Sequence, residues 1–177
     1  MMLIGSELPY DEQGNIGKQI FTTKGLGKMV DEVVPGVIQC SINKRKCILI
    51  SEKTTLRERW QEVSEEMSRT GAKEMILATL DETISPPVLQ NLSEENIVIT
   101  TTKSIKNKCY KNNEEVITFE DLLQSCAVKQ PYWNAYDYSE EQRNEILDNF
   151  NQQYLNNINK HPYVAKYALK MIETFKK

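Results

Sequence analysis

Histidine is almost absent from this chain of 177 residues, in which His161 is the only imidazole. A Ser/His/Asp triad or a histidine-rich zinc site needs an imidazole beside its other groups, whereas His161 is followed by Pro162 near the C-terminus. Neither kind of site can be assembled within one chain. We expect His161 to serve a helix cap or a loop.

Cysteine is scarce as well, and its spacing contains no CxxC pair of the kind that indicates zinc binding or redox chemistry. The four cysteines are Cys40, Cys47, Cys109 and Cys126. Two of them fall in predicted strands, where a thiol packs as a small hydrophobic group. We therefore expect reduced, structural thiols.

Long apolar runs and an excess of positive charge are also missing. No run approaches the roughly 20 apolar residues of a membrane span, and the opening MMLIGSELPYDEQ lacks the basic start of a signal peptide. We expect a cytoplasmic protein with no membrane contact. The net charge of −3 gives no overall attraction to nucleic acid, so any DNA contact must come from a local basic patch.

The composition is that of a globular protein, with 40% hydrophobic and 27% charged residues. The length is sufficient for one domain with a real core. We predict a single domain over residues 1–177, with its core over about 28–127 and a C-terminal helical extension over about 139–176.

Residues 46–70 are predicted to form a buried strand that runs directly into an amphipathic helix. The apolar run from Cys47 to Ile50 is typical of a strand covered on both faces. A helix over 55–70, with Gly71 as its C-cap residue, is indicated by apolar residues at spacings of four, three and four: Leu56, Trp60, Val63 and Met67. Polar residues crowd the junction between the two elements.

Strand alternation places Ser51 and Lys53 on one face of this strand and Glu52 on the other. Helical periodicity places Glu66 at the border of the buried stripe of the helix, on the side shared with Arg59. If the helix packs back on the sheet, Glu66 and Lys53 converge. Such an arrangement suits a metal-bound carboxylate beside an ammonium group that activates water.

An aspartate lies inside the preceding predicted strand, residues 29–34, which Pro35 and Gly36 end by forcing a turn. Asp31 shares its face with Met29 and Val33, and a carboxylate on an otherwise apolar face is costly unless it is paired or bound to a cation. The alternative is a twist that leaves Asp31 exposed at the edge of the strand.

The remaining elements follow from periodicity and turn signals. We read residues 5–28 as loops around a short helix or strand, 37–42 as a second strand, 43–45 as a hairpin turn and 46–51 as the third strand of an antiparallel meander. Further strands are predicted at 74–80, 96–102 and 116–119, short helices at 88–92 and 120–127, and a linker at 130–138. The strand, helix, strand order around residues 46–80 predicts a right-handed crossover and parallel pairing.

The densest positive patch extends over residues 103–111 and includes Lys103 and Lys106. Either a solvated loop or contact with phosphates explains it. After this patch, Ser139 and Gln142 form a capping box for one amphipathic helix, and Pro162 begins another. These two helices must cover either the sheet or a partner subunit.

The order of strands and the three charged residues together resemble the PD-(D/E)XK nuclease core. The segment LISEKTTLRERWQEV is similar to the KTT-x-x-x-RW segment of type II restriction endonucleases of the EcoRII-like group. In that group the second acid of the motif has moved from the strand to the following helix. Here Ser51 stands where the acid is expected, Glu66 lies 13 residues beyond Lys53, and Asp31 lies 22 residues before it.

The resemblance implies an α/β fold, with a mixed central sheet flanked by helices, and a Mg²⁺-dependent endodeoxyribonuclease acting on double-stranded DNA as a homodimer. Asp31 and Glu66 would hold the metal, and Lys53 would orient or deprotonate the attacking water. Arg59 would contact the phosphate or brace the acid. We assign further DNA or phosphate contacts to Thr54, Arg57, Lys103 and Lys106.

Other classes of function fit the same residues. A non-cleaving DNA-binding or assembly subunit with this fold would bind DNA in a salt-sensitive way without turnover. A repair nuclease would nick DNA without sequence preference. Spacing alone also allows three unrelated surface charges on an α/β domain, but the KTTLRERW segment favours the nuclease.

Overall fold

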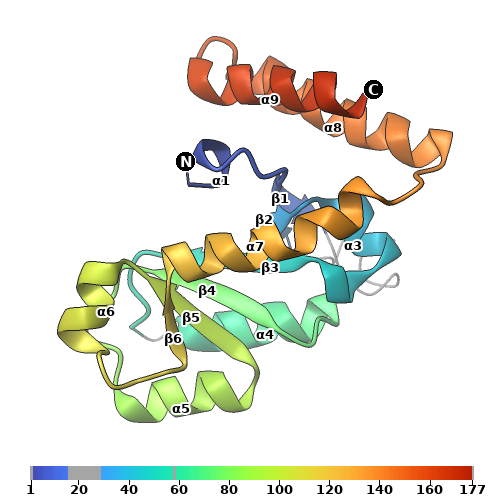
Figure 1. Ribbon diagram of the computed structural model, residues 1–177. Helices are drawn as coiled ribbons and strands as arrows, with labels where there is room; N and C mark the ends of the chain where they lie inside the picture. The colour runs from blue at the N-terminus through green and yellow to red at the C-terminus, as the bar shows by residue number, and fades with distance from the viewer. Residues whose placement is uncertain (1, 16–28, 58, 177) are drawn as a thin grey trace.

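The computed structural model describes residues 2–15, 29–57 and 59–176. Its centre is one six-stranded sheet with the strands in sequence order (Figure 1). The strands are β1 (Asp11–Asn15), β2 (Met29–Val34), β3 (Ile48–Lys53), β4 (Met75–Thr79), β5 (Ile97–Thr101) and β6 (Val116–Thr118). Strands β1 to β3 are antiparallel and β3 to β6 are parallel, so the predicted mixed sheet is confirmed.

Helices lie on both faces of the sheet. The helices of the described residues are α1 (Met2–Gly5), α3 (Val37–Ile42), α4 (Trp60–Thr70), α5 (Pro86–Glu94), α6 (Lys103–Cys109), α7 (Phe119–Asn134), α8 (Glu140–Asn157) and α9 (Pro162–Phe175), with a 3₁₀ turn η1 at Lys44–Lys46. In Figure 1, α7 crosses one face of the sheet while α4 lies on the other. Helix α4 connects β3 to its parallel neighbour β4, as the strand, helix, strand order predicts.

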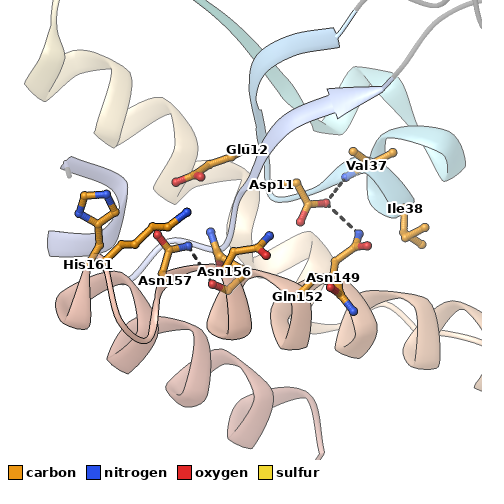
Figure 2. A pocket seen from close by; sticks show the side chains of 11 residues that line it. Asp11, Glu12, Val37, Ile38, Asn149, Gln152, Asn156, Asn157 and His161 are labelled. Carbon is orange, nitrogen blue, oxygen red and sulfur yellow. Dashed lines mark hydrogen bonds between the residues drawn. The ribbon is translucent and has the colours of Figure 1, made fainter.

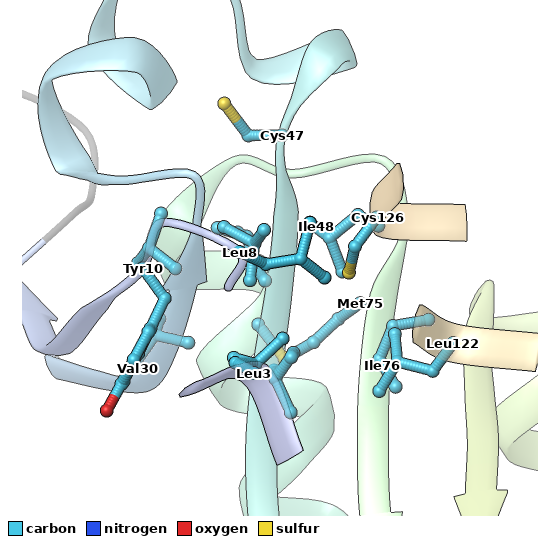
Figure 3. Packing of buried hydrophobic residues seen from close by; sticks show 14 of the residues in the cluster. Leu3, Leu8, Tyr10, Val30, Cys47, Ile48, Met75, Ile76, Leu122 and Cys126 are labelled. Carbon is cyan, nitrogen blue, oxygen red and sulfur yellow. The ribbon is translucent and has the colours of Figure 1, made fainter. Parts of the chain in front are cut away.

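The core fills the space between the sheet and these helices. Side chains from the N-terminal segment, the sheet and α7 pack together on one face, as Figure 3 shows for Leu3, Leu8, Ile48, Ile76 and Leu122. On the other face Val63 of α4 is completely buried. Burial of α4 against the sheet fixes the position of every other side chain on that helix, including Glu66.

The prediction of a strand at residues 37–42 was wrong, because this segment is the helix α3. Strand β2 pairs directly with β3, and its second antiparallel partner is β1, in a region predicted to consist mainly of loops. The β-branched residues Val37 and Ile38 favour a strand, but the Asp11 carboxylate accepts a hydrogen bond from the Val37 N–H at 2.7 Å, where α3 begins. The side-chain amide of Gln39, a buried residue of α3, donates to the Tyr138 hydroxyl at 3.3 Å. Residues 16–28 of the predicted loop region lie outside the described part of the chain.

Several boundaries also differ from the sequence prediction. Residues 44–46 are a 3₁₀ turn rather than part of a hairpin, and β3 runs to Lys53 rather than to residue 51. The basic segment 103–109 is the helix α6, capped by the Thr102 side chain, rather than a loop. Helix α7 continues to Asn134, into the first part of the predicted linker, because the buried Trp133 anchors it, donating from its indole nitrogen to the Lys46 carbonyl at 2.9 Å.

The two C-terminal helices form a pair that covers the N-terminal segment. The predicted capping box of Ser139 and Gln142 begins α8, and Pro162 begins α9. The Tyr167 hydroxyl of α9 donates to the Leu8 carbonyl at 2.7 Å, and its ring lies 5.5 Å from that of Tyr10. These contacts hold the pair on the N-terminal segment of the same chain, and the alternative of a partner subunit stays a prediction. No helix within the described residues is long and apolar enough to cross a membrane.

The cysteines give a testable prediction about the core. All four are free thiols; Cys109 is half-buried and the others are buried. Burial raises the pKa of Cys126 to about 11, so this thiol is neutral and protected at pH 8. We expect a chromogenic disulfide reagent at pH 8 to label Cys109 first in the native protein and the others only on unfolding. Early labelling of Cys126, mapped by mass spectrometry, would contradict this packing.

Candidate active site

Three charged side chains meet where β3 ends. The Lys53 Nζ lies 3.5 Å from Asp31 Oδ2 and 3.5 Å from Glu66 Oε1. The side chains of Lys53 and Glu66 are only 7% and 5% exposed, whereas that of Asp31 is 42% exposed. The group is therefore open to solvent at Asp31 and closed on the α4 side.

A fully buried hydroxyl joins these groups. Ser51 Oγ donates to Glu66 Oε2 at 2.7 Å and accepts from Lys53 Nζ at 3.0 Å. The same Oγ lies 3.5 Å from Asp31 Oδ2, and that carboxylate oxygen accepts the Glu52 N–H at 2.7 Å. Ser51 thus fixes the acid of the helix and the amine of the strand relative to each other.

Local structure explains why these residues converge. Ser51 and Lys53 are buried and Glu52 is exposed, as strand alternation predicts. Glu32 is paired with Ile50 in the antiparallel register, which places Asp31 beside Ser51 on the α4 face. Because α4 packs through Val63, the residue three positions later, Glu66, faces the same way. The sequence-predicted meeting of Asp31, Lys53 and Glu66 is seen in the structure.

The donor set fits a small divalent cation. Carboxylate oxygens are hard ligands, and Mg²⁺ is commonly held by one or two carboxylates and completed by water or a substrate phosphate. Asp31 and Glu66 supply such oxygens within 3.5 Å of Ser51 Oγ, and the partial exposure of Asp31 gives access to water. Within the described ranges no group of three or more His, Cys, Asp or Glu side chains forms a metal cluster. Asp31 and Glu66 are the two carboxylates that lie 3.5 Å from Lys53 Nζ.

Comparison with known proteins identifies the family. The profile described as EcoRII C terminal matches residues 25–123, which include Asp31, Lys53 and Glu66. The chain belongs to this family. The resemblance to the EcoRII-like group that the KTTLRERW segment indicated is thereby confirmed.

A relative and a structural neighbour of this chain agree with the family assignment. The type II restriction enzyme SsoII of Shigella sonnei is 47% identical over 167 residues, which are 94% of this chain and 54% of that enzyme. A structure of metal-depleted Ecl18kI in complex with uncleaved DNA superimposes with a TM-score of 0.84 and 42% identity, covering 97% of this chain and 56% of that one. The chain therefore spans about half the length of these relatives.

A more distant structure shares the fold alone. The restriction endonuclease PspGI, solved as a complex with substrate DNA, aligns with a TM-score of 0.61 at 16% identity, over 74% of this chain and 58% of that one. The predicted restriction-endonuclease-like core with a mixed sheet and C-terminal helices is thus confirmed.

The sequence-predicted phosphate contacts lie along the edge of the sheet where Lys53 ends β3. Thr54 and Arg57 follow β3 directly, and both side chains are exposed. Lys103 and Lys106 lie on α6, which follows the parallel strand β5 at the same edge. Arg59 is the residue before α4, and its Nε lies 3.4 Å from Glu62 Oε2 in a half-exposed ion pair.

Glu32, the neighbour of Asp31 in β2, belongs to the opposite face of the sheet. Burial raises the pKa of Glu32 to about 7, and the nearby carboxylate of Glu52 acts in the same direction. Glu12 lies directly opposite Glu32 in the strand register. Alternation along β2 therefore separates Asp31, which faces Lys53, from a second group of acids that does not share its site.

A cleft of about 780 Å³ lies between β1 and α8, outside this group (Figure 2). Its α8 wall carries amide side chains, among them Asn149, Gln152 and Asn156. Asp11 on the other wall accepts from the Val37 N–H and from Asn149 Nδ2, at 2.7 and 3.3 Å. Burial raises the pKa of Asp11 against the effect of these two hydrogen bonds. The cleft contains none of the predicted site residues.

Sequence reasoning missed two features of the candidate site. Ser51 was recognised only as the residue that replaces an acid, whereas its hydroxyl links Lys53 and Glu66. The predicted helix over 55–70 begins only at Trp60, because residues 54–57 form a loop whose Leu56 N–H donates to the buried Asp81 at 2.8 Å. The D-x-T pattern of Asp81 and Thr83, typical of a turn closed by an aspartate side chain, was the available signal.

Proposed function

We propose that this chain forms the catalytic part of a type II restriction endonuclease that hydrolyses phosphodiester bonds of double-stranded DNA with Mg²⁺. The observation that carries the proposal is the cluster of Asp31, Lys53 and Glu66 around Ser51 Oγ, with Lys53 Nζ 3.5 Å from each carboxylate. Family membership and relatives described as a restriction enzyme and as DNA complexes support it.

Each residue of the cluster has a different proposed role in the reaction. Asp31 and Glu66 would hold Mg²⁺, which when bound supplies electrostatic stabilisation of the charge that develops on the scissile phosphate. Lys53 Nζ orients the attacking water or takes its proton as the water oxygen bonds to phosphorus and the phosphodiester P–O bond breaks. Ser51 keeps Lys53 and Glu66 in place, with hydrogen bonds of 3.0 and 2.7 Å.

DNA contact is assigned to the polar and basic residues near this edge of the sheet. Thr54, Arg57 and Arg59 follow β3, and Lys103 and Lys106 lie on α6. Their local charge is what a chain with a net charge of −3 needs for binding to phosphates. We also propose a homodimer, because one active site per chain then cuts each strand of the duplex; light scattering with and without DNA tests this.

The test is divalent-dependent cleavage of a defined plasmid by the purified chain, followed by sequencing of the ends. Discrete ends at one repeated sequence, lost in EDTA, are the expected result. Random nicking would favour a repair nuclease instead. Salt-sensitive DNA binding without turnover in Mg²⁺ or Mn²⁺ would favour a non-cleaving subunit.

Ser51→Ala tests the hydroxyl that joins the site. Removing it breaks hydrogen bonds to the side chains of Lys53 and Glu66, and a hydrogen bond to a charged group is worth about 1.5–3 kcal/mol. We expect single-turnover cleavage to slow by about 10-fold or more. Ser64→Ala is the matched control, because Ser64 Oγ donates only to the Trp60 carbonyl of its own helix, at 3.5 Å. Equal rates for the two variants would exclude a role for Ser51.

A further inference from the structure

The loop of residues 54–57 is held by a carboxylate from another part of the chain. We propose that Asp81 is a positioning residue that fixes this loop so that Thr54 and Arg57 face the DNA. The inference rests on the proposed function and adds a residue outside the KTTLRERW segment to the machinery. Asp81 follows β4, the parallel neighbour of β3, so both segments leave the sheet at the same edge.

The two oxygens of Asp81 serve different segments. Oδ2 accepts the Leu56 N–H of the loop at 2.8 Å. Oδ1 accepts both the N–H and the hydroxyl of Thr83, each at 2.8 Å, and closes the turn that Asp81 begins. An aspartate needed only for its own turn would use Oδ1 alone. The bond to Leu56 is therefore the observation that ties this turn to the loop.

The backbone of the loop needs such support. Arg57 has φ 41, in the left-handed region that non-glycine residues rarely adopt without surrounding structure that holds them. The side chain of Leu56 is 2% exposed and anchors the loop from the core side. Asp81 holds the same residue through a hydrogen bond from the Leu56 N–H. Together the two contacts keep residues 54–57 out of α4.

A competing conformation is encoded in the sequence. Leu56 continues the apolar stripe of α4, and this pattern predicts a helix from residue 55. Extending α4 to begin at residue 55 would place the Leu56 N–H in the first turn, where it has no acceptor within the helix, and would point Arg57 in a different direction. By accepting the Leu56 N–H, Asp81 favours the loop over this helical turn.

Asp81 itself is rigidly placed. It is 7% exposed, its N–H donates to Thr79 Oγ1 at 3.1 Å, and its carbonyl accepts from the Tyr110 hydroxyl at 2.8 Å. The same hydroxyl accepts the Ile84 N–H at 3.1 Å. Burial raises the pKa of Asp81, but hydrogen bonds from Leu56, Thr83 and Arg57 outweigh this effect and hold the pKa below its usual value. The carboxylate is therefore ionised at neutral pH and accepts at both oxygens.

Asp81→Asn tests the proposal in the full chain. The substitution replaces one accepting oxygen with an amide that donates. Two quantities are measured: the rate of tryptic cleavage at Arg57 and Arg59, mapped by mass spectrometry, and kcat/KM on cleavable DNA. We expect both to change by about 10-fold, with faster proteolysis and lower kcat/KM. Mg²⁺ affinity without DNA, measured by calorimetry, is expected to stay unchanged, because Asp31 and Glu66 are untouched.

Asp11→Asn is the matched control, because Asp11 also accepts a backbone N–H at 2.7 Å but lies at α3, away from the loop. It is expected to leave both quantities unchanged. If Asp81→Asn fails to fold, Tyr110→Phe is tested in its place. Tyr110→Phe removes the hydroxyl that bonds to the Asp81 carbonyl and the Ile84 N–H, so it loosens the same turn while keeping the carboxylate. We expect proteolysis to become about 3-fold faster and kcat/KM about 3-fold lower.

The outcomes separate the two proposals. If Asp81→Asn leaves the rate of proteolysis at the loop unchanged, the positioning role is overturned. It is also overturned if proteolysis becomes faster while kcat/KM stays unchanged. The proteolysis measurement does not depend on catalytic activity. If the wild-type chain cleaved no DNA, the proposed function would be wrong, but the change in the rate of proteolysis caused by Asp81→Asn would still test the role of Asp81.

Discussion

Glu66→Gln is expected to lower the rate of Mg²⁺-dependent DNA cleavage by at least about 100-fold while the protein stays folded. The substitution keeps the shape of a side chain that is 5% exposed and leaves an oxygen that accepts from Ser51. It removes the negative charge of one of the two carboxylates proposed to hold the metal. Single-turnover cleavage measures the first effect, and calorimetric titration with Mg²⁺ is expected to show weaker binding.

Glu65→Gln is the control for this prediction. Glu65 lies on the same helix, but its side chain is 66% exposed and pairs with Arg69 at 3.9 Å. Surface pairs of this kind contribute little to stability, so the control is expected to behave as wild type. Cleavage by Glu66→Gln at the rate of Glu65→Gln would remove Glu66 from the active site.

Lys53→Met is expected to reduce cleavage by at least about 100-fold, because it removes the group that orients the water or accepts its proton. It also removes the positive charge 3.5 Å from both Asp31 and Glu66, so two carboxylates then face each other without the amine. The variant should therefore unfold at a lower temperature than wild type in EDTA.

Added Mg²⁺ should raise the melting temperature of Lys53→Met more than that of wild type. The cation replaces the missing positive charge, and a ligand that binds only the folded state stabilises it. Scanning calorimetry in EDTA and in Mg²⁺ measures this difference. Lys73→Met, at an exposed residue in the turn after α4, is the control. If Mg²⁺ stabilises Lys53→Met no more than wild type, Lys53 does not share a site with the metal.

Asp31, Lys53 and Glu66 could be selected from the sequence because each depends on a short-range rule. Alternation along β3 places Lys53 and Ser51 on one face, and helical spacing from Val63 brings Glu66 to the buried side of α4. The KTTLRERW segment then distinguished this group from unrelated surface charges. The catalytic roles of the three residues remain predictions.

The failures occurred where distant residues override local preference. Val37 and Ile38 favour a strand, but Asp11, 26 residues before Val37, accepts its N–H at 2.7 Å at the start of α3. Trp133 similarly holds α7 in a region that reads as a linker, through a bond to Lys46, 87 residues away. Propensity within a short window contains no information about such partners.

By itself, the sequence determined the approximate positions of the strands β2 to β6, the amphipathic helix α4 and the face of that helix on which its glutamate lies, because periodicity depends only on neighbours along the chain. Only the tertiary structure decided where α4 begins. The N–H of Leu56 is captured by Asp81, 25 residues away, and the position of Arg57 follows from that bond. A hydrogen bond between residues this far apart in the sequence can be recognised only in the folded chain, where the sheet brings the ends of β3 and β4 together.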